Sequence, residues 1–227
     1  MLTLTKRLQA VANTVNQSTL FCDVGTDHAY LPTYLLLTKK VGKAYASDIR
    51  KGPLDSARRT AIEYKVEDKM DLILSDGLDS ISHDITEIAI AGMGGVMIAD
   101  IIKRAEWLKD KKYHLVLQPM TKIAHLRKAL YQYGFEIEYE TAVVDDKRPY
   151  TVMSVRYFGK CEEVTELFSY IGKLSPKGDG KFYFEKQIKK LDRKINGLIK
   201  SENSENDAEI KRLTPLRDGI IEYLNKA

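Results

Sequence analysis

The sequence predicts an α/β protein with a doubly wound, mostly parallel sheet of seven strands and a C-terminal helical hairpin. Five short apolar runs alternate with helix-length segments between residues 19 and 132, and two longer β-rich runs follow up to residue 158. Beyond residue 160 the strand patterns stop and amphipathic helical patterns replace them. Alternating strands and helices are typical of parallel βαβ units. A chain of 227 residues is long enough for one such core with a smaller appendage.

Composition limits the classes of protein that the chain can represent. Hydrophobic residues make up 44% and charged residues 30%, which is typical of a globular protein with a packed core. The two cysteines, Cys22 and Cys161, lack the paired spacing of a zinc site or a redox motif. No stretch approaches the roughly 20 apolar residues of a membrane span, and the first residues do not form a secretion signal. We therefore expect a cytoplasmic protein without a metal or a membrane anchor.

The elements follow from the spacing of apolar residues. Leu4, Leu8, Val11 and Val15 recur at steps of four, three and four, which predicts a helix over residues 4–15. Continuous apolar character, as in strands covered on both faces, predicts strands at 19–24, 43–48, 71–75, 87–91 and 114–118. Helices are expected between them at 30–40, 53–64, 95–108 and 121–132, with Pro53 at a helix start.

The last two strands are expected to form an antiparallel hairpin at one edge of the sheet. They cover 135–143 and 150–158 and are joined by the turn-forming segment DDKRP. A helix at 162–172 and a joint at 175–180 lead into two polar helices. The first repeats Phe184, Ile188, Leu191, Ile195 and Leu198 at coiled-coil spacing. We expect a catalytic domain at 1–160 and a separate, core-poor helical domain at 161–227.

A candidate ligand site follows the first strand, in the segment DVGTDHAYLP. Ligands of open parallel sheets bind beyond the carboxyl ends of the strands. Gly25 opens the turn there, but the pattern Gly25-Thr26-Asp27-His28 lacks the further glycines of a dinucleotide fingerprint. The additional carboxylate of Asp27 would repel a pyrophosphate. The segment therefore favours a cationic ligand.

S-adenosylmethionine has that character, because it carries a sulfonium and an ammonium that can pair with carboxylates. Asp48 ends the second strand 25 residues after Asp23, close to the spacing expected of an acid that binds ribose hydroxyls. Asp76 follows the third strand, where it could accept a hydrogen bond from an adenine amino group. Each of these acids alone is equally consistent with a structural cap, since Asp is common at strand ends.

Five segments together resemble the bacterial tRNA (adenine-22, N1)-methyltransferases, the TrmK family. They are DVGTDHAYLP at 23–32, SDIRKGPLDSA at 47–57, DGL at 76–78, AGMGG at 91–95 and QP at 118–119. The resemblance covers most of residues 1–160 and implies a class I Rossmann-like methyltransferase fold. It also implies S-adenosylmethionine as donor and an adenine in the D-arm of tRNA as acceptor. The donor residues are expected to be Asp23, Gly25, Thr26, His28, Asp48, Ile49, Asp76, Gly77, Ala91 and Gly92.

The AGMGG segment indicates how an acceptor base is held. It offers backbone groups and one soft side chain, Met93, in place of the side-chain amide or carboxylate of enzymes that methylate amino groups. Adenine N1 already has a free lone pair, so alignment is the main requirement. Because N1 lies on the pairing edge, the base must be unpaired and held by stacking, for which Met93, Tyr30 and Tyr150 are candidates. Asp27 is expected to stabilise the positive charge that develops on the ring.

The first tail helix is strongly basic. Seven basic residues, Lys181, Lys186, Lys189, Lys190, Arg193, Lys194 and Lys200, stand against Glu185 and Asp192, which gives a charge of 7 − 2 = +5. This favours contact with tRNA over a merely solvated face. Two alternatives stay open at this stage: a nicotinamide-dependent oxidoreductase, and an RNA- or protein-binding module with a vestigial pocket. The oligomeric state also stays open.

Overall fold

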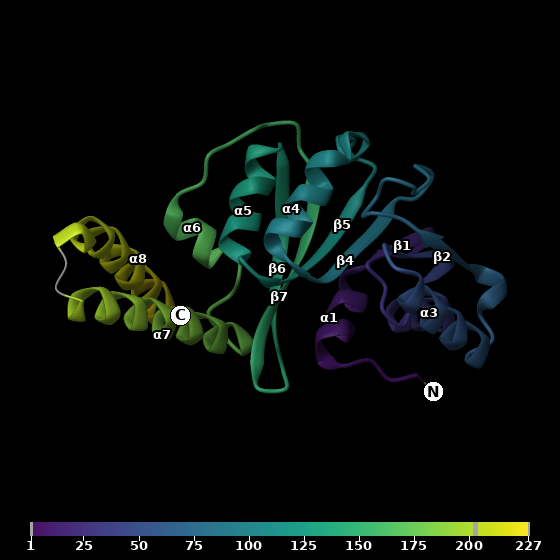
Figure 1. Ribbon diagram of the computed structural model, residues 1–227, viewed down its shortest axis with the longest axis horizontal. Helices are drawn as coiled ribbons and strands as arrows, with labels where there is room; N and C mark the ends of the chain where they lie inside the picture. Colours follow the sequence, from purple (N-terminus) through teal and green to yellow (C-terminus); the bar gives the residue numbers. More distant parts are fainter. Residues whose placement is uncertain (1, 202–203, 227) are drawn as a thin grey trace.

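The computed structural model describes residues 2–201 and 204–226, which form a seven-stranded sheet covered by helices and a helical tail (Figure 1). The strands are β1 (Ser18–Val24), β2 (Val41–Asp48), β3 (Met70–Leu74), β4 (Glu87–Gly94), β5 (His114–Thr121), β6 (Phe135–Asp145) and β7 (Arg148–Tyr157). Their order is β3-β2-β1-β4-β5-β7-β6. The first five are parallel, and β7 is antiparallel to both β5 and β6. The fold class predicted from the sequence is therefore confirmed.

Helices cover both faces of the sheet. On one face, α1 (Lys6–Thr14), α2 (Tyr30–Leu37) and α3 (Lys51–Glu63) pack on alternate strand residues such as Phe21 and Ala46. On the other face, α4 (Gly95–Arg104) and α5 (Ile123–Gln132) pack on the remaining strand residues, among them Val24 and Ile90. Short 3-10 turns occur at Glu67–Lys69 (η1), Glu106–Leu108 (η2) and Ser204–Asn206 (η3). Burial on both faces explains why the strands read as continuous apolar runs.

Several element boundaries differ from the expected ones. The strand expected at 87–91 is longer, because β4 continues to Gly94 through two register irregularities, and α4 then begins at Gly95. Helix α3 begins at Lys51, so that Pro53 lies in its first turn but not at its start. Helix α2 ends at Leu37, before Lys39 adopts a positive φ of 57°. The β6–β7 turn has positive φ at both Asp146 and Lys147, as in the type I′ turns that match strand twist.

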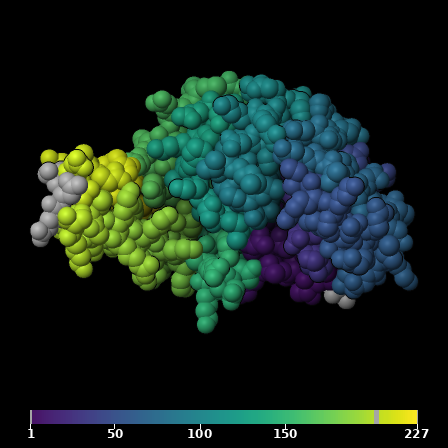
Figure 2. Space-filling model, in the orientation of Figure 1, coloured from purple at the N-terminus to yellow at the C-terminus, as the bar shows by residue number. Residues whose placement is uncertain are grey.

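The tail contains α6 (Glu166–Ile171), α7 (Asp179–Lys200) and α8 (Asp207–Asn225). The expected helix at 162–172 is thus shorter, and the joint at 175–180 already includes the first turn of α7. Helices α7 and α8 pack along each other through an apolar cluster that includes Leu191, Ile195, Leu213 and Ile220. Supercoiling of this pair stays a prediction. In Figure 2 the two helices form a lobe beside the body, and the β6–β7 hairpin projects between this lobe and α1.

A buried ion pair connects the tail to the sheet, so the expectation of an isolated tail is wrong. The apolar cluster between its helices shows that the tail is not poor in core residues either. The division into domains at residue 160 stays a prediction. Arg127 of α5 is fully buried and donates from Nε and Nη2 to the two carboxylate oxygens of Glu140 on β6, at 2.9 and 2.6 Å. Its Nη1 donates to the backbone oxygens of Ser169 and Tyr170 in α6 and to the hydroxyl of Tyr183 in α7. One guanidinium therefore connects the sheet to two tail helices.

The chain passes directly beside this ion pair at Gly172. A Cβ atom at that position would lie 2.3 Å from Glu140 Oε1 and 2.5 Å from Arg127 Nε, and the φ of Gly172 is 63°. Only glycine satisfies both the space and the backbone angle. The docking of the tail therefore depends on this residue as well as on the ion pair.

Replacing Arg127 with Met should destabilise the protein by about 3–5 kcal/mol, because Glu140 would then be buried without a cation. Unfolding in urea, followed by circular dichroism, measures this loss. The control is Arg212→Met, which breaks ion pairs of a half-exposed guanidinium with Glu209 and Glu166 and should cost at most about 1 kcal/mol. A loss below about 1 kcal/mol for Arg127→Met would show that the buried pair does not anchor the tail.

Candidate functional site

Two cavities lie beyond the carboxyl ends of the parallel strands, where the strand order reverses between β1 and β4. One has a volume of about 340 Å³ and is lined by α1, the turn after β1 and the end of β4. The other, of about 540 Å³, is lined by the ends of β2 and β3 and by α4. Gly25 lines both cavities. We call them the α1 cavity and the α4 cavity.

The ten expected donor residues all lie along these two cavities. The α1 cavity contains Asp23, Gly25, Thr26, His28, Ala91 and Gly92. The α4 cavity contains Asp48, Ile49, Asp76 and Gly77. Of the three residues expected to act on the acceptor, Asp27 lines the α1 cavity, Met93 lines the α4 cavity and Tyr150 lines neither.

Gly25 forms the boundary between the cavities. Its φ is 77°, and a Cβ atom there would lie 2.0 Å from the Met93 methyl carbon, so the Met93 side chain rests directly on the glycine backbone. The amides of Gly25 and Thr26 both donate to the carbonyl oxygen of Ser47 at 2.8 Å, which ties the turn after β1 to the end of β2. A ligand that occupies both cavities must pass over Gly25. A flexible, unbranched Met side chain can move aside to admit it.

Among the titratable groups that line the two cavities, the carboxyl group of Asp23 has the pKa that departs furthest from its ordinary value. Its side chain is almost wholly buried, and burial raises the pKa of Asp23 to about 6. Among residues 2–201 and 204–226, no basic side chain forms an ion pair with it. A buried carboxylate without a cation is destabilising in the free protein. It is therefore well suited to face a positive group of a ligand.

The α4 cavity offers a second buried carboxylate and an apolar wall. Oδ1 of Asp48 accepts a hydrogen bond from Arg50 N at 2.8 Å and lies 3.7 Å from Arg50 Nε. No donor among the described residues contacts Oδ2. Ile49, next in the chain, is 60% exposed at the cavity wall. Asp76 differs from Asp48, because Arg104 of α4 holds both of its oxygens, at 3.0 and 3.3 Å. A ligand amine would share Asp76 with this guanidinium.

An aromatic pair stands at the rim of the α1 cavity. The rings of His28 and Tyr30 are stacked, with centroids 5.3 Å apart and planes inclined by 14°, and Tyr30 is 43% exposed. Asp27 is exposed and lies 3.5 Å from His28 Nε2. Tyr150 is half-buried on β7, with the guanidinium of Arg7 at 5.9 Å from its ring centroid. The rim thus presents aromatic faces and one carboxylate.

Three site residues escape the sequence analysis. Arg7 of α1 and Gln118 of β5 meet at the α1 cavity, where Arg7 Nη1 donates to Gln118 Oε1 at 2.6 Å. Arg104 lines the α4 cavity. The periodicity of the first helix places Arg7 among its solvated residues and does not indicate a site residue. Gln118 appears in the sequence only within the QP segment at 118–119, where a polar residue ends an apolar strand.

Comparison with known proteins identifies the family. The methyltransferase domain model matches residues 4–153. This chain belongs to that methyltransferase family. A Bacillus subtilis relative, named tRNA (adenine(22)-N(1))-methyltransferase, is 35% identical over 153 residues, which are 67% of this chain and 64% of the relative. The match therefore spans slightly less than two thirds of that relative's length.

Solved methyltransferase structures resemble nearly the whole chain. The structure of the B. subtilis M1A22 tRNA methyltransferase TrmK has a TM-score of 0.87 and 26% identity, and the alignment covers 99% of this chain and 100% of that one. A putative tRNA (m1A22) methyltransferase from Streptococcus pneumoniae, solved with S-adenosyl-L-methionine, has a TM-score of 0.81 and 26% identity over 98% of this chain and 100% of that one. The resemblance inferred from the sequence motifs is confirmed, and so is the Rossmann-like methyltransferase fold.

Two kinds of feature are absent from the described residues of this methyltransferase. Within the described ranges, 2–201 and 204–226, no helix combines the length and apolarity that a membrane crossing requires. The same residues contain no group of three or more His, Cys, Asp or Glu side chains placed to hold a metal ion.

The raised pKa of Asp23 predicts a pH-dependent effect on stability. Asp23 ionises near pH 6 in the folded protein but near its ordinary value of 3.8 when unfolded. As pH rises from 4 to 6 the unfolded chain loses this proton first, so the free energy of unfolding falls by about 2 kcal/mol. Asp23→Asn keeps the shape and lacks this ionisation. The free energy of unfolding of this variant, relative to that of the parent, should therefore increase by about 2 kcal/mol between pH 4 and pH 7 in urea unfolding.

The matched control is Asp71→Asn, an exposed carboxylate on β3 that pairs with Lys43. Its difference from the parent should change little over the same pH range. A pH-independent difference for Asp23→Asn would contradict the assignment of a strained, buried carboxylate.

Proposed function

We propose that this protein transfers a methyl group from S-adenosylmethionine to N1 of an adenine in the D-arm of tRNA, at position 22. The observation that carries the proposal is the pair of cavities that meet at Gly25, with buried carboxylates from the ends of β1 and β2. The chain's 35% identity with the B. subtilis tRNA (adenine(22)-N(1))-methyltransferase supports the same acceptor. A tRNA substrate also favours a cytoplasmic location.

The residues present fit S-adenosylmethionine. The unpaired, buried carboxylate of Asp23 suits an ammonium, and Gly25 removes the Cβ atom that would obstruct a ligand crossing between the cavities. Asp48 Oδ2 can accept hydrogen bonds from ribose hydroxyls, while Ile49 and Gly77 line the space for an adenine. Thr26, Ala91 and Gly92 contribute walls of the α1 cavity, and Asp76 borders the α4 cavity with Arg104.

The bound donor supplies an electrophilic methyl group on a sulfonium. The protein's residues then have to hold an unpaired adenine so that its N1 lone pair points at that group, which is chiefly a problem of alignment. Tyr30, already stacked on His28 at the rim, extends an aromatic surface on which a base can stack. Met93 and Tyr150 are proposed to border the base from β4 and β7. Asp27, beside His28, is proposed to stabilise the positive charge that forms on the methylated ring.

The proposal is tested with labelled donor and two transcripts of one tRNA, with adenine or guanine at position 22. Label should enter the adenine transcript as 1-methyladenosine and enter the guanine transcript at least about tenfold more slowly. Asp48→Ala should lower the rate of methyl transfer at limiting donor, since a lost charge-assisted hydrogen bond costs roughly 1.5–3 kcal/mol of donor affinity. The rate should recover at saturating donor. Equal labelling of both transcripts would place the acceptor elsewhere.

Titration with donor and with a nicotinamide dinucleotide separates the two other candidate functions. An oxidoreductase would bind the dinucleotide, and a vestigial pocket would bind neither ligand. The proposal requires binding of S-adenosylmethionine alone.

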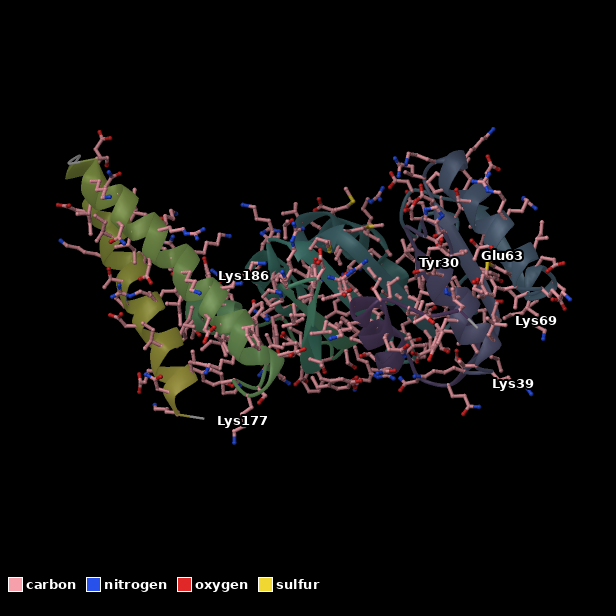
Figure 3. All side chains as sticks on the ribbon, turned by 90° about the horizontal axis from the view of Figure 1, so that it is seen from below. Tyr30, Lys39, Glu63, Lys69, Lys177 and Lys186 are labelled. Atoms are coloured by element: carbon pink, nitrogen blue, oxygen red, sulfur yellow. The ribbon has the colours of Figure 1, made fainter. Side chains whose placement is uncertain are left out.

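We also propose that a basic groove between α7 and the β6–β7 turn binds the tRNA backbone. The groove has a volume of about 400 Å³ and contains five basic side chains, Lys147, Lys186, Lys189, Lys190 and Arg193. None of the five forms an ion pair with a described residue. Lys194, grouped with them from the sequence, instead pairs with Glu209 of α8. Lys186 lies far from Tyr30 (Figure 3), so an RNA that reaches both must span the molecule.

Replacing Lys186, Lys189, Lys190 and Arg193 with Gln should weaken tRNA binding and flatten its salt dependence. Each lost phosphate contact lowers the log–log salt slope by about 0.7–0.9, so four contacts would remove roughly 3 units. Filter binding over a range of salt concentrations measures this change. The matched control replaces four exposed basic residues between the end of α2 and the start of β3, Lys39, Arg58, Lys65 and Lys69, and should leave the slope near that of the parent. Figure 3 shows Lys39 and Lys69 at the end of the molecule away from Lys186. An unchanged slope for the groove variant would assign the RNA to another surface.

A further inference from the structure

Phe182 is an exposed aromatic residue near the start of α7, next to two buried ones. Its side chain is 54% exposed, whereas Tyr183 and Phe184 are almost completely buried in the apolar cluster of the tail. The rings of Tyr183 and Phe184 pack edge-on against each other, with centroids 5.4 Å apart. Within the described part of the chain, Phe182 makes no such ring contact and no cation–π contact. Its ring therefore does not belong to the core of the tail.

The ring of Phe182 faces the basic groove, which it lines together with Pro149 of β7. Five charged residues of α7 follow it at steps of three or four and line the same groove: Glu185, Lys186, Lys189, Lys190 and Arg193. This spacing places them on one face of the helix. A single exposed apolar side chain, such as Ile199 at 55%, needs no ligand to explain it. Phe182 differs, because its ring begins a row of charged side chains.

A hydrogen bond fixes the position of the ring relative to the other wall of the groove. Asp179, three residues before Phe182, accepts a hydrogen bond at Oδ2 from the backbone N–H of Val144 on β6, at 2.8 Å. Val144 is paired with Pro149 across the β6–β7 hairpin. The first turn of α7 is thus held beside this hairpin (Figure 1). Both walls of the groove are therefore in place before a ligand binds.

An unpaired RNA base is complementary to this combination of side chains. Proteins that bind single strands hold the phosphates with basic residues and stack the bases on aromatic rings. The groove offers both, with five basic side chains against the one acid, Glu185. The bases of a duplex are stacked on one another, so a stem of RNA would leave the ring of Phe182 in water. The excess of basic side chains favours a polyanion over a polypeptide.

We propose that Phe182 stacks an unpaired base of the bound tRNA, while the basic side chains of the groove contact the phosphates beside this base. The assignment rests on the proposed function and specifies the form of RNA that the groove takes, which is a loop or a single strand. Lys186 lies far from Tyr30 in Figure 3, so this base belongs to a different nucleotide from the adenine that is methylated. The protein thus holds tRNA at two unpaired nucleotides.

The test measures tRNA binding by filter binding over a range of salt concentrations. Phe182→Ala should bind tRNA at least about fivefold more weakly, the loss expected when one stacked base is released. The log–log salt slope should stay at the parental value, because no phosphate contact is removed. Phe182→Tyr keeps the ring and should keep the parental affinity. Phe182→Leu keeps an apolar side chain without an aromatic face and should bind tRNA more weakly than Phe182→Tyr.

Two further measurements separate stacking from a structural role. Phe182→Ala should lose affinity for a short single-stranded RNA of mixed sequence and keep its affinity for the same strand in a blunt duplex. It should raise the KM for tRNA but leave kcat, donor affinity and melting temperature at the parental values, since the side chain is exposed. The matched control is Ile199→Ala, which shortens another exposed apolar side chain of α7 outside the groove and should bind tRNA as the parent does.

Parental tRNA affinity in Phe182→Ala or in Phe182→Leu would overturn the stacking assignment. So would equal losses for the single strand and the duplex, or an equal loss in Ile199→Ala. A flattened salt slope in Phe182→Ala would also contradict it, because the substitution would then have displaced the basic side chains. These outcomes leave the proposed function intact as long as the parent methylates tRNA. If the parent transfers no methyl group to tRNA, the proposed function itself fails.

Discussion

The geometry of the candidate site depends on the carbonyl oxygen of Ser47, which accepts hydrogen bonds from the amides of both Gly25 and Thr26. This shared acceptor holds the turn after β1 against the end of β2. The carbonyl of Asp48 continues the connection by accepting a bond from Ser75 N after β3, at 3.0 Å. Three neighbouring strand ends are thus linked through their backbones. Side chains that follow these strands inherit their positions from the sheet.

A second constraint is the presence of charge that the protein does not neutralise internally. Asp23 is buried without a cation, and Arg7 is anchored by a neutral amide. The first arrangement is unfavourable for stability alone, since buried charges are ordinarily paired, whereas Arg7 is only half-buried. They contrast with Arg127 and Glu140, which neutralise each other completely at the junction of sheet and tail. The molecule therefore pairs its charges where it needs rigidity and leaves them unpaired where it is proposed to bind a ligand.

Much of this arrangement could be predicted from the sequence, because it is local. Asp23 and Asp48 lie at the ends of strands that their apolar runs reveal, and Asp76 follows a third. Parallel strands bring such residues to one edge of the sheet. The residues that were missed depend on contacts between distant segments. Arg7 meets a partner 111 residues away in Gln118, and Arg127 reaches α6 and α7 across 42 to 56 residues. Helical periodicity assigns such side chains only to a face and cannot indicate their partners.

The tail and the AGMGG segment illustrate the same limit. Counting basic residues grouped Lys194 with the groove, although its partner Glu209 lies on a different helix and no spacing rule connects the two. The apolar run ends the fourth strand at residue 91, whereas pairing with β5 continues this strand to Gly94. In both cases the outcome was decided by a neighbouring element. Local propensity carries no information about that neighbour.

The central claim is that one ligand crosses Gly25 and occupies both cavities. A crystal structure of the protein with S-adenosylhomocysteine tests it most directly. The account predicts continuous ligand density over Gly25, with the ribose at Asp48, the amino acid end at Asp23, and the Met93 methyl group moved off the glycine. Density confined to one cavity, with Met93 still resting on Gly25, would contradict it.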